Sequence, residues 1–213
     1  MKRIPIIPTA FVTLAVAIMI LLGFWQLERR DEKARQLALY AANVDKPAMA
    51  FPALGPVADG AMFRRSSLHC LRVVETTVMS GKAADGSSGF RYIARCSTGA
   101  EGPGALVVLG VGEKPDLKIG WNGGPVSGRI TREPEKAGWI THMLGKAPVP
   151  GPMLVSDKGL GTLKTPAAPA MTDIPNNHVA YAMQWFFFAM AAIVIYVLAL
   201  RHRLAQPRAE AAV

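Results

Sequence analysis

The residues of this chain that could do chemistry stand at the start of its second long apolar stretch. His178 precedes the apolar run 179–200, and Tyr181, Gln184 and Trp185 lie just inside it. Helical spacing places His178, Tyr181 and Trp185 on one stripe, with Gln184 beside it, because residues three, four and seven apart share a helix face. A neutral imidazole can ligate iron and aromatic rings can cover a flat macrocycle, so this stripe suits a haem or another planar ligand.

A plainer interpretation of the same residues stays open from the sequence alone. Tyrosine and tryptophan form interfacial belts in many membrane proteins, and Pro175 with Asn176 or Asn177 is typical of a helix start. His178 would then be a hydrated residue at the membrane edge, since ionisable groups are functional by default only when they lie within the membrane.

A second polar cluster ends the first apolar stretch, the run 4–27, which closes with Gly23, Trp25 and Gln26. Both runs are long enough, at about 1.5 Å per residue, to cross a hydrocarbon core of about 30 Å. If both cross, the two clusters lie at the same membrane surface. The sequence therefore predicts one site in which Trp25 and Gln26 complete the pocket around His178.

Charged residues at the ends of the two runs predict the topology. Lys2 and Arg3 precede the first run, and Arg201, Arg203 and Arg208 follow the second, so both tails are expected in the cytoplasm. The first run is longer than the apolar part of a signal peptide and lacks a small-residue cleavage motif before its charged flank. It is therefore expected to be a retained anchor.

The chain divides into four predicted segments. Residues 1–27 form the N-terminal tail and first transmembrane helix, 28–175 an extracytoplasmic β-rich domain, 176–200 the second transmembrane helix, and 201–213 a cytoplasmic tail. The predicted fold class is membrane α + β, in which two transmembrane helices flank a mostly antiparallel β domain.

The outer domain has its own pattern of elements. The first helix is expected to continue through 28–40, whose residues favour helix, and to stop in the proline-rich segment 43–60. Gly/Ser-rich turns at 82–89 and 98–104 have the length and composition that join antiparallel strands. Runs with β-branched, alternating or short apolar patterns predict strands at 71–79, 90–96, 105–111, 117–121, 126–132 and 153–156.

Both cysteines, Cys70 and Cys96, fall in the outer domain, where oxidising conditions permit a disulfide. The alternative is a metal site in which they converge with His69 and His142, although no Cys-x-x-Cys or His-x-x-x-His spacing supports it. A copper chaperone would need such a site, and a bridged cysteine pair would exclude it.

Motifs and charge argue against an enzyme and against nucleic-acid binding. The chain has no phosphate-binding loop, dinucleotide-binding glycine motif or nucleophile elbow. Its 24 Lys and Arg exceed its 15 Asp and Glu, but these basic residues are dispersed and do not gather on a binding motif. We therefore expect a non-enzymatic protein that binds no nucleic acid.

Two motifs at opposite ends of the chain resemble those of the Surfeit locus protein 1 family, called Shy in yeast. LLGFWQLERRDEK is similar to the family's G-x-W-Q-L-x-R-x-x-x-K signature, and IPNNHVAYAMQWFFF to its P-N-N-H-x-x-Y-A-x-Q-W-F segment. The resemblance implies an assembly factor for haem–copper cytochrome c oxidase, in the bacterial cytoplasmic (inner) membrane or, in a eukaryote, the mitochondrial inner membrane. It also implies haem a binding or transfer during maturation of the largest oxidase subunit, with the haem a synthesis machinery as a further candidate partner.

The resulting hypothesis is a haem a chaperone, and the alternative is a membrane scaffold that holds an oxidase subunit without binding haem. An absorption spectrum of the purified protein separates the two. The residues expected in the haem a pocket are His178 as axial ligand, with Tyr181, Gln184, Trp185, Trp25 and Gln26 around it.

Overall fold

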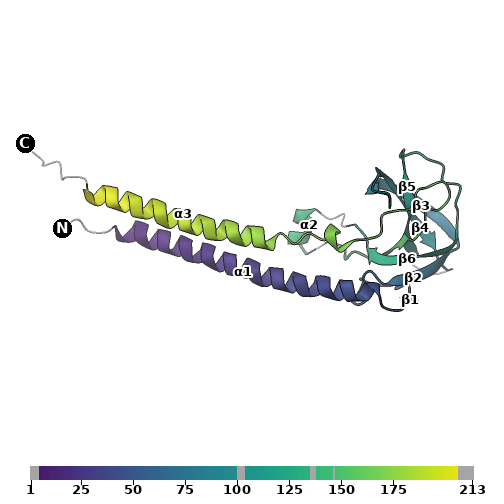
Figure 1. Cartoon of the computed structure of the whole chain (residues 1–213), viewed down its shortest axis with the longest axis horizontal. Coiled ribbons are helices and arrows are strands. Elements are labelled where there is room, and N and C mark those ends of the chain that lie inside the picture. The colour runs from purple at the N-terminus through teal and green to yellow at the C-terminus, as the bar shows by residue number, and fades with distance from the viewer. Residues whose placement is uncertain (1–4, 100–103, 135–137, 146, 206–213) are drawn as a thin grey trace, which may run out of the picture. The chain divides into compact units, whose positions relative to one another are not determined.

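The computed structural model describes residues 5–99, 104–134, 138–145 and 147–205, and it divides the chain into two compact units. The membrane unit joins the two ends of the sequence, because it contains the chain up to Arg35 and again from Pro175 onward. The outer unit runs from Gln36 to Ile174. In sequence order, two apolar helices, labelled α1 and α3 in Figure 1, thus precede and follow a mostly antiparallel sheet domain, which confirms the predicted fold class.

The membrane unit is built from α1 (Ile6–Val44) and α3 (His178–Ala205). Both helices are long and apolar enough to cross a membrane, and only 6% of the most apolar window of each is buried in protein. A core helix of a soluble protein would be mostly covered, so these apolar surfaces suit contact with lipid.

Helix α1 is much longer than a membrane span requires. Its 39 residues extend for about 58 Å, against a hydrocarbon core of about 30 Å. The helix continues without a break through residues 28–40, as predicted, and it ends at Val44, three residues before Pro47.

In the described part of the outer unit, seven strands form one sheet with the order β1-β2-β6-β7-β5-β4-β3. Neighbouring strands are antiparallel except for the parallel pairs β1 with β2 and β5 with β7. A short helix, α2 (Trp139–Met143), and a 3₁₀ turn, η1 (Met171–Asp173), lie outside the sheet. The strands are β1 (Met49–Ala50), β2 (Arg65–Cys70), β3 (Arg72–Lys82), β4 (Ser88–Ser97), β5 (Ala105–Gly112), β6 (Gly124–Arg132) and β7 (Pro152–Ser156).

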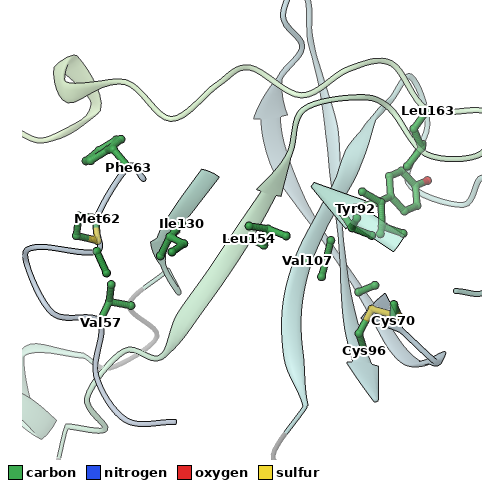
Figure 2. Packing of buried hydrophobic residues seen from close by; sticks show 14 of the residues in the cluster. Val57, Met62, Phe63, Cys70, Tyr92, Cys96, Val107, Ile130, Leu154 and Leu163 are labelled. Carbon is green, nitrogen blue, oxygen red and sulfur yellow. A yellow bond between two sulfur atoms is a disulfide. The ribbon is translucent and has the colours of Figure 1, made fainter. Parts of the chain in front are cut away.

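Strand β5 lies at the centre of the core. Val107, Val108 and Leu109 are fully buried, so both faces of this strand are covered. Its sequence is a continuous apolar run and not an alternating one, which is typical of a strand buried on two sides. Leu154 of β7 and Ile130 of β6 pack in the same core, whose side chains Figure 2 shows.

The prediction of a strand at 117–121 is wrong, because this segment is a loop. The Tyr92 hydroxyl accepts a hydrogen bond from the Leu117 amide at 2.9 Å and donates one to the Lys114 carbonyl at 2.6 Å. Gly120 has a φ of 67°, which an L side chain rarely adopts and which interrupts an extended strand. The alternating apolar residues Leu117, Ile119 and Trp121 pack on the core. The backbone near Leu117 is hydrogen-bonded to the Tyr92 side chain and not to a neighbouring strand.

Candidate functional site

The sequence-predicted residues Gln26 and His178 meet in the membrane unit. The Nδ1 atom of His178 lies 2.8 Å from the Oε1 atom of Gln26. An amide oxygen only accepts, so Nδ1 carries the proton, and in the neutral form of the ring the lone pair is on Nε2. We call these two residues the imidazole–amide pair. This hydrogen bond fixes Nδ1, so Nε2 is the ring nitrogen that could bind a metal.

Small residues bring the two helices together next to this pair. A Cβ atom on Gly23 would lie 2.5 Å from Cε1 of Phe186, so only glycine permits the observed packing of that ring against α1. On α3, Ala182 and Ala189 are buried and stand seven residues apart, which keeps them on one face. Glycine and alanine are the residues that allow close helix approach in membranes.

A second polar contact joins the same helices at their other end. Tyr196 and Thr9 share a hydrogen bond between their hydroxyl groups, and the Thr9 hydroxyl donates to the Pro5 carbonyl at 2.7 Å. Seventeen residues separate Thr9 from Gln26, and 18 separate His178 from Tyr196, which corresponds to about 26 Å along each helix. The helices are therefore antiparallel, and their two polar contacts are about one hydrocarbon thickness apart.

Two predicted aromatic residues are near the imidazole–amide pair in sequence, since Trp25 precedes Gln26 in α1 and Tyr181 lies one turn after His178 in α3. Phe24 of α1 and Phe186 of α3 meet edge to face, with ring centroids 5.5 Å apart. Trp25 and Tyr181 take no part in this ring contact. Both are 51% exposed, while Trp185 is half-buried.

Two further predicted residues differ in their surroundings. Trp185 packs edge to face against Phe188, with centroids 6.4 Å apart, and so belongs to an aromatic surface of α3. Gln184 is exposed and is not brought to His178. The stripe predicted from spacing is thus divided, because His178, Ala182 and Trp185 are at least half-buried while Tyr181 is exposed.

The turn before α3 adds a polar group. Asn177 begins the helix, because its carbonyl accepts a hydrogen bond from the Tyr181 amide at 3.2 Å. The Oδ1 atom of the neighbouring Asn176 is buried and has no hydrogen-bond partner in the part of the chain that the structure describes. A buried acceptor without a donor is costly, so the segment leading to His178 has hydrogen-bonding capacity for a ligand or water.

The cysteines form a disulfide and not a metal site. Cys70 and Cys96 are bonded, with their Cα atoms 5.2 Å apart, at the ends of β2 and β4. Cys70 is buried while His69 is exposed, as strand alternation predicts, and the side chain of His142 lies outside the described structure. Among the described residues no three His, Cys, Asp or Glu side chains gather as metal ligands. A copper site with free thiols is therefore excluded for this pair.

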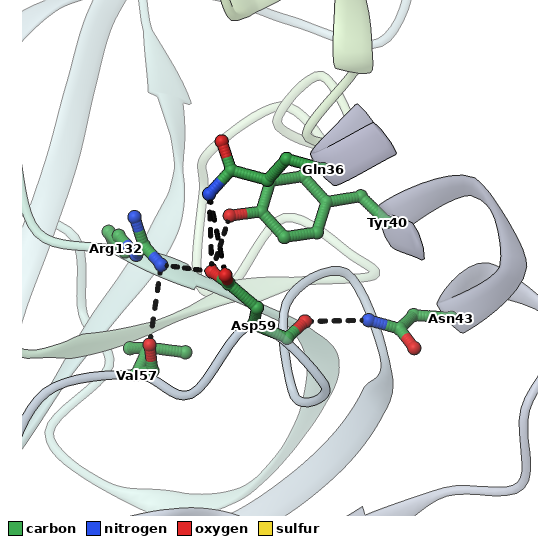
Figure 3. Close-up of polar contacts among 6 residues, drawn as sticks. All are labelled: Gln36, Tyr40, Asn43, Val57, Asp59 and Arg132. Atoms are coloured by element: carbon green, nitrogen blue, oxygen red, sulfur yellow. Dashed lines mark hydrogen bonds and ion pairs between the residues drawn. The ribbon is translucent and has the colours of Figure 1, made fainter. Parts of the chain in front are cut away.

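The sequence did not predict a second polar cluster, which lies in the outer unit around Asp59 (Figure 3). Its carboxylate accepts hydrogen bonds from the Tyr40 hydroxyl at 2.7 Å and the Arg132 guanidinium at 2.6 Å, and one from Gln36 at 3.3 Å. The hydrogen bond from Tyr40 lowers the pKa of the Asp59 carboxyl most, and the hydrogen bond from Gln36 and the charge and hydrogen bond of Arg132 act in the same direction. The Asp59 carbonyl also accepts from Asn43 at 2.8 Å. We call these five residues the Asp59 cluster.

The Asp59 cluster attaches the last turns of α1 to the sheet domain. Gln36, Tyr40 and Asn43 are spaced by four and three residues, so they lie on one face of the helix. That spacing of polar groups on the helix beyond its apolar run is a signal for a polar contact on this face, although it does not identify the acceptor. The acceptor, Asp59, stands in a loop whose position only the tertiary structure reveals.

The model of the SURF1 family matches residues 13–190. The match begins within α1 and ends within α3, so it includes both members of the imidazole–amide pair and the whole outer unit. No curated protein matches the chain.

Proposed function

The chain belongs to the SURF1 family, and on that basis we propose that it is a non-enzymatic assembly factor for haem–copper cytochrome c oxidase. The proposal includes binding or handing over haem a during maturation of the largest oxidase subunit. The two apolar helices make it a membrane protein, as a factor that attends a membrane-embedded subunit needs to be.

The observation that carries the haem a proposal is the hydrogen bond of the imidazole–amide pair. Histidines that ligate metals almost always donate their other ring nitrogen to an oxygen acceptor, which sets the tautomer and the ring orientation. Gln26 supplies that acceptor to His178. The arrangement fits the axial ligand of a haem, in which Nε2 donates to iron while Nδ1 is held.

The surrounding side chains suit a flat apolar ligand. Trp25 and Tyr181 expose about half of their surface beside the pair, and Trp185 extends the aromatic surface along α3. These rings would cover one face of the macrocycle. The exposed amide of Gln184 could form hydrogen bonds with polar substituents of the macrocycle. One protein ligand on an open surface is suited to transfer, because release then requires one bond to break.

We propose that both termini lie in the cytoplasm and that the outer unit is extracytoplasmic. Arg201 and Arg203 in the last turns of α3, Arg208 beyond them in the sequence, and Lys2 and Arg3 near the N-terminus support this orientation by the positive-inside rule. The Cys70–Cys96 disulfide suits an oxidising compartment on the other side of the membrane. In a bacterium this is the inner membrane, and in a eukaryote the mitochondrial inner membrane.

The test is the haem content of the full chain purified in detergent from cells that make haem a. The wild-type protein is expected to show a Soret band and to yield haem a on extraction, and His178→Ala to lose most of it. His202→Ala is the matched control, because His202 lies in the last turn of the same helix, far from Gln26. Undiminished haem in His178→Ala would remove this residue from the ligand role.

The same preparation tests the scaffold alternative. A protein without a Soret band that still copurifies with the largest oxidase subunit would hold that subunit without carrying haem. The partner assignment and the haem assignment therefore fail separately, since one is measured by copurification and the other by absorption.

A further inference from the structure

Strand β3 lies at an edge of the sheet, where it pairs only with β4 among the strands that the structure describes. It has 11 residues, and the stretch Thr76–Gly81 within it contains neither charge nor proline. Natural edge strands are usually short, charged or interrupted, because an open edge is a template for another strand. This edge lacks that protection over its central residues.

The hydrogen-bond pattern identifies which backbone groups face outward. The Ala83 amide donates to the Ser87 carbonyl opposite it, so this is a hydrogen-bonded pair, and the adjacent Lys82 must point away from β4. The Lys82 carbonyl indeed accepts from the Ala167 amide at 2.9 Å. The register is unbroken from Glu75 to Lys82, so alternate residues share this orientation. The outward-facing residues are Thr76, Val78 and Ser80.

Other segments of the chain already occupy both ends of this edge. At the start, the Val73 amide donates to the Asn122 carbonyl at 3.1 Å, and at the end Ala167 pairs with Lys82. Between these points no hydrogen bond from any described residue reaches the outward backbone groups. We call this interval, residues 74–81, the open edge.

Each face of the sheet beside the open edge has a hollow with apolar side chains in its lining. On one face, Thr76 and Val78 border a shallow groove closed by Ile119 and Trp121 of the loop 117–121. On the other face, Thr77 and Met79 border a small pocket formed with Ile93 and Leu106. An added strand directs alternate side chains to the two faces, so it would place an apolar residue in each.

Arg91 lies beside the open edge and indicates which charge an added strand would carry. The Nε atom of Arg91 is buried and has no hydrogen-bond partner in the described structure. It would lie 2.9 Å from a Cβ atom on Gly81, so the Arg91 side chain crosses β3 where β3 has no side chain. Arg91 as a whole is only partly buried, and the best partner of a guanidinium group is a carboxylate.

We propose that the open edge is a docking site for an extended segment of another protein, which adds to the sheet as a strand. The segment carries apolar or threonine side chains opposite Thr77 and Val78 and an acidic side chain opposite Gly81. Its backbone pairs with the outward groups of β3, and its carboxylate accepts from Arg91. The inference does not depend on haem binding, because none of these residues belongs to the membrane unit.

The test uses amide hydrogen exchange of the full chain in nanodiscs with a synthetic probe peptide. The probe has about six residues, the usual length of a strand, and consists of alternating threonine and valine with one glutamate at an end. It is expected to slow exchange at Thr76, Val78 and Ser80 by at least about tenfold, without changing the amides between them, which β4 already protects. A peptide with lysine in place of glutamate should bind at least about tenfold more weakly.

Two variants separate the backbone and charge contributions. Ser80→Pro removes an outward donor without breaking the ladder to β4, so it should abolish slowing at Thr76 and Val78. Arg91→Gln should bind the glutamate and lysine peptides equally. Absence of any slowing at millimolar peptide would overturn the proposal. So would a full chain that is dimeric and already protected at these amides, because a second copy would then be the occupant.

Discussion

Removing the Asp59 carboxylate is expected to destabilise the outer unit by about 3 kcal/mol. Tyr40 is only 1% exposed, and in Asp59→Ala its hydroxyl loses its hydrogen-bond acceptor. Leaving such a buried donor unsatisfied costs about 1–3 kcal/mol. The lost pair with Arg132 adds at most about 1 kcal/mol, because both side chains are more than 40% exposed.

Exchange of the β5 amides measures this loss for the outer unit alone. Val107, Val108 and Leu109 are fully buried, so their slow exchange reports the opening of the whole unit. A loss of about 3 kcal/mol accelerates it about a hundredfold, since each 1.4 kcal/mol is tenfold. Glu75→Ala is the matched control, because its pair with Arg95 is 3.7 Å long and exposed and should contribute less than about 0.5 kcal/mol.

Coupling between Tyr40 and Asp59 provides a sharper criterion. Tyr40→Phe should cost about 1 kcal/mol, because Asp59 keeps its bonds from Arg132 and Gln36. Once the hydroxyl is absent, Asp59→Ala no longer leaves it unsatisfied, so the double variant should be more stable than additivity predicts by about 1–2 kcal/mol. Additive losses would show that the hydroxyl and carboxylate do not act as a pair.

The pH dependence follows from the lowered pKa of Asp59. A carboxylate whose pKa is lower in the folded state stabilises that state above its ordinary pKa of about 3.9 and loses the effect as pH falls through the folded value. The difference in stability between wild type and Asp59→Ala should therefore be the same at pH 7 and pH 5 and shrink only below about pH 4. A difference that has already disappeared at pH 5, or one below about 0.5 kcal/mol at pH 7, would refute the assigned role.

Three further predictions concern the helix pair and the disulfide. Gln26→Leu should weaken haem a binding by about 10–100-fold, as loss of a partner to a ligating histidine does, and Gln26→Glu should restore it; equal binding by both, measured by titration, would separate Gln26 from ligation. Gly23→Val should destabilise the helix pair by about 1–3 kcal/mol, because its Cβ would overlap the Phe186 ring, and a thermal melt unchanged from wild type would contradict this packing. Cys96→Ser should lower the stability of the outer unit by about 3.5 kcal/mol, from the 26-residue separation of the bridged cysteines, and wild type in reductant should match it in β5 amide exchange.

The parts of the fold that depend on local pattern were predictable. The apolar runs of α1 and α3 and the buried strand β5 follow from hydrophobic length and composition alone. The segment 117–121 shows where pattern fails, because its alternation reflects packing of a loop held by the Tyr92 hydroxyl. Alternation of apolar and polar residues indicates which side chains face the core, but it does not show which groups form hydrogen bonds with the backbone.

The candidate site was predictable to a different degree. Topology places Gln26 and His178 at the same surface, so their proximity follows once both helices cross the membrane. The Asp59 cluster could not be found in this way, since Asp59 reaches α1 through a loop of no regular structure. Side-chain contacts between a helix and a loop depend on the whole outer unit.

The depth of the site in the membrane follows from the two polar contacts between α1 and α3. The hydrogen bond between Thr9 and Tyr196 and the imidazole–amide pair are about 26 Å apart along the helices, so they match the two faces of a hydrocarbon core about 30 Å thick. Neither contact can slide by a turn without taking a polar group into lipid, which is costly. If both helices cross the membrane, His178 is held at one face by register as well as by Gln26.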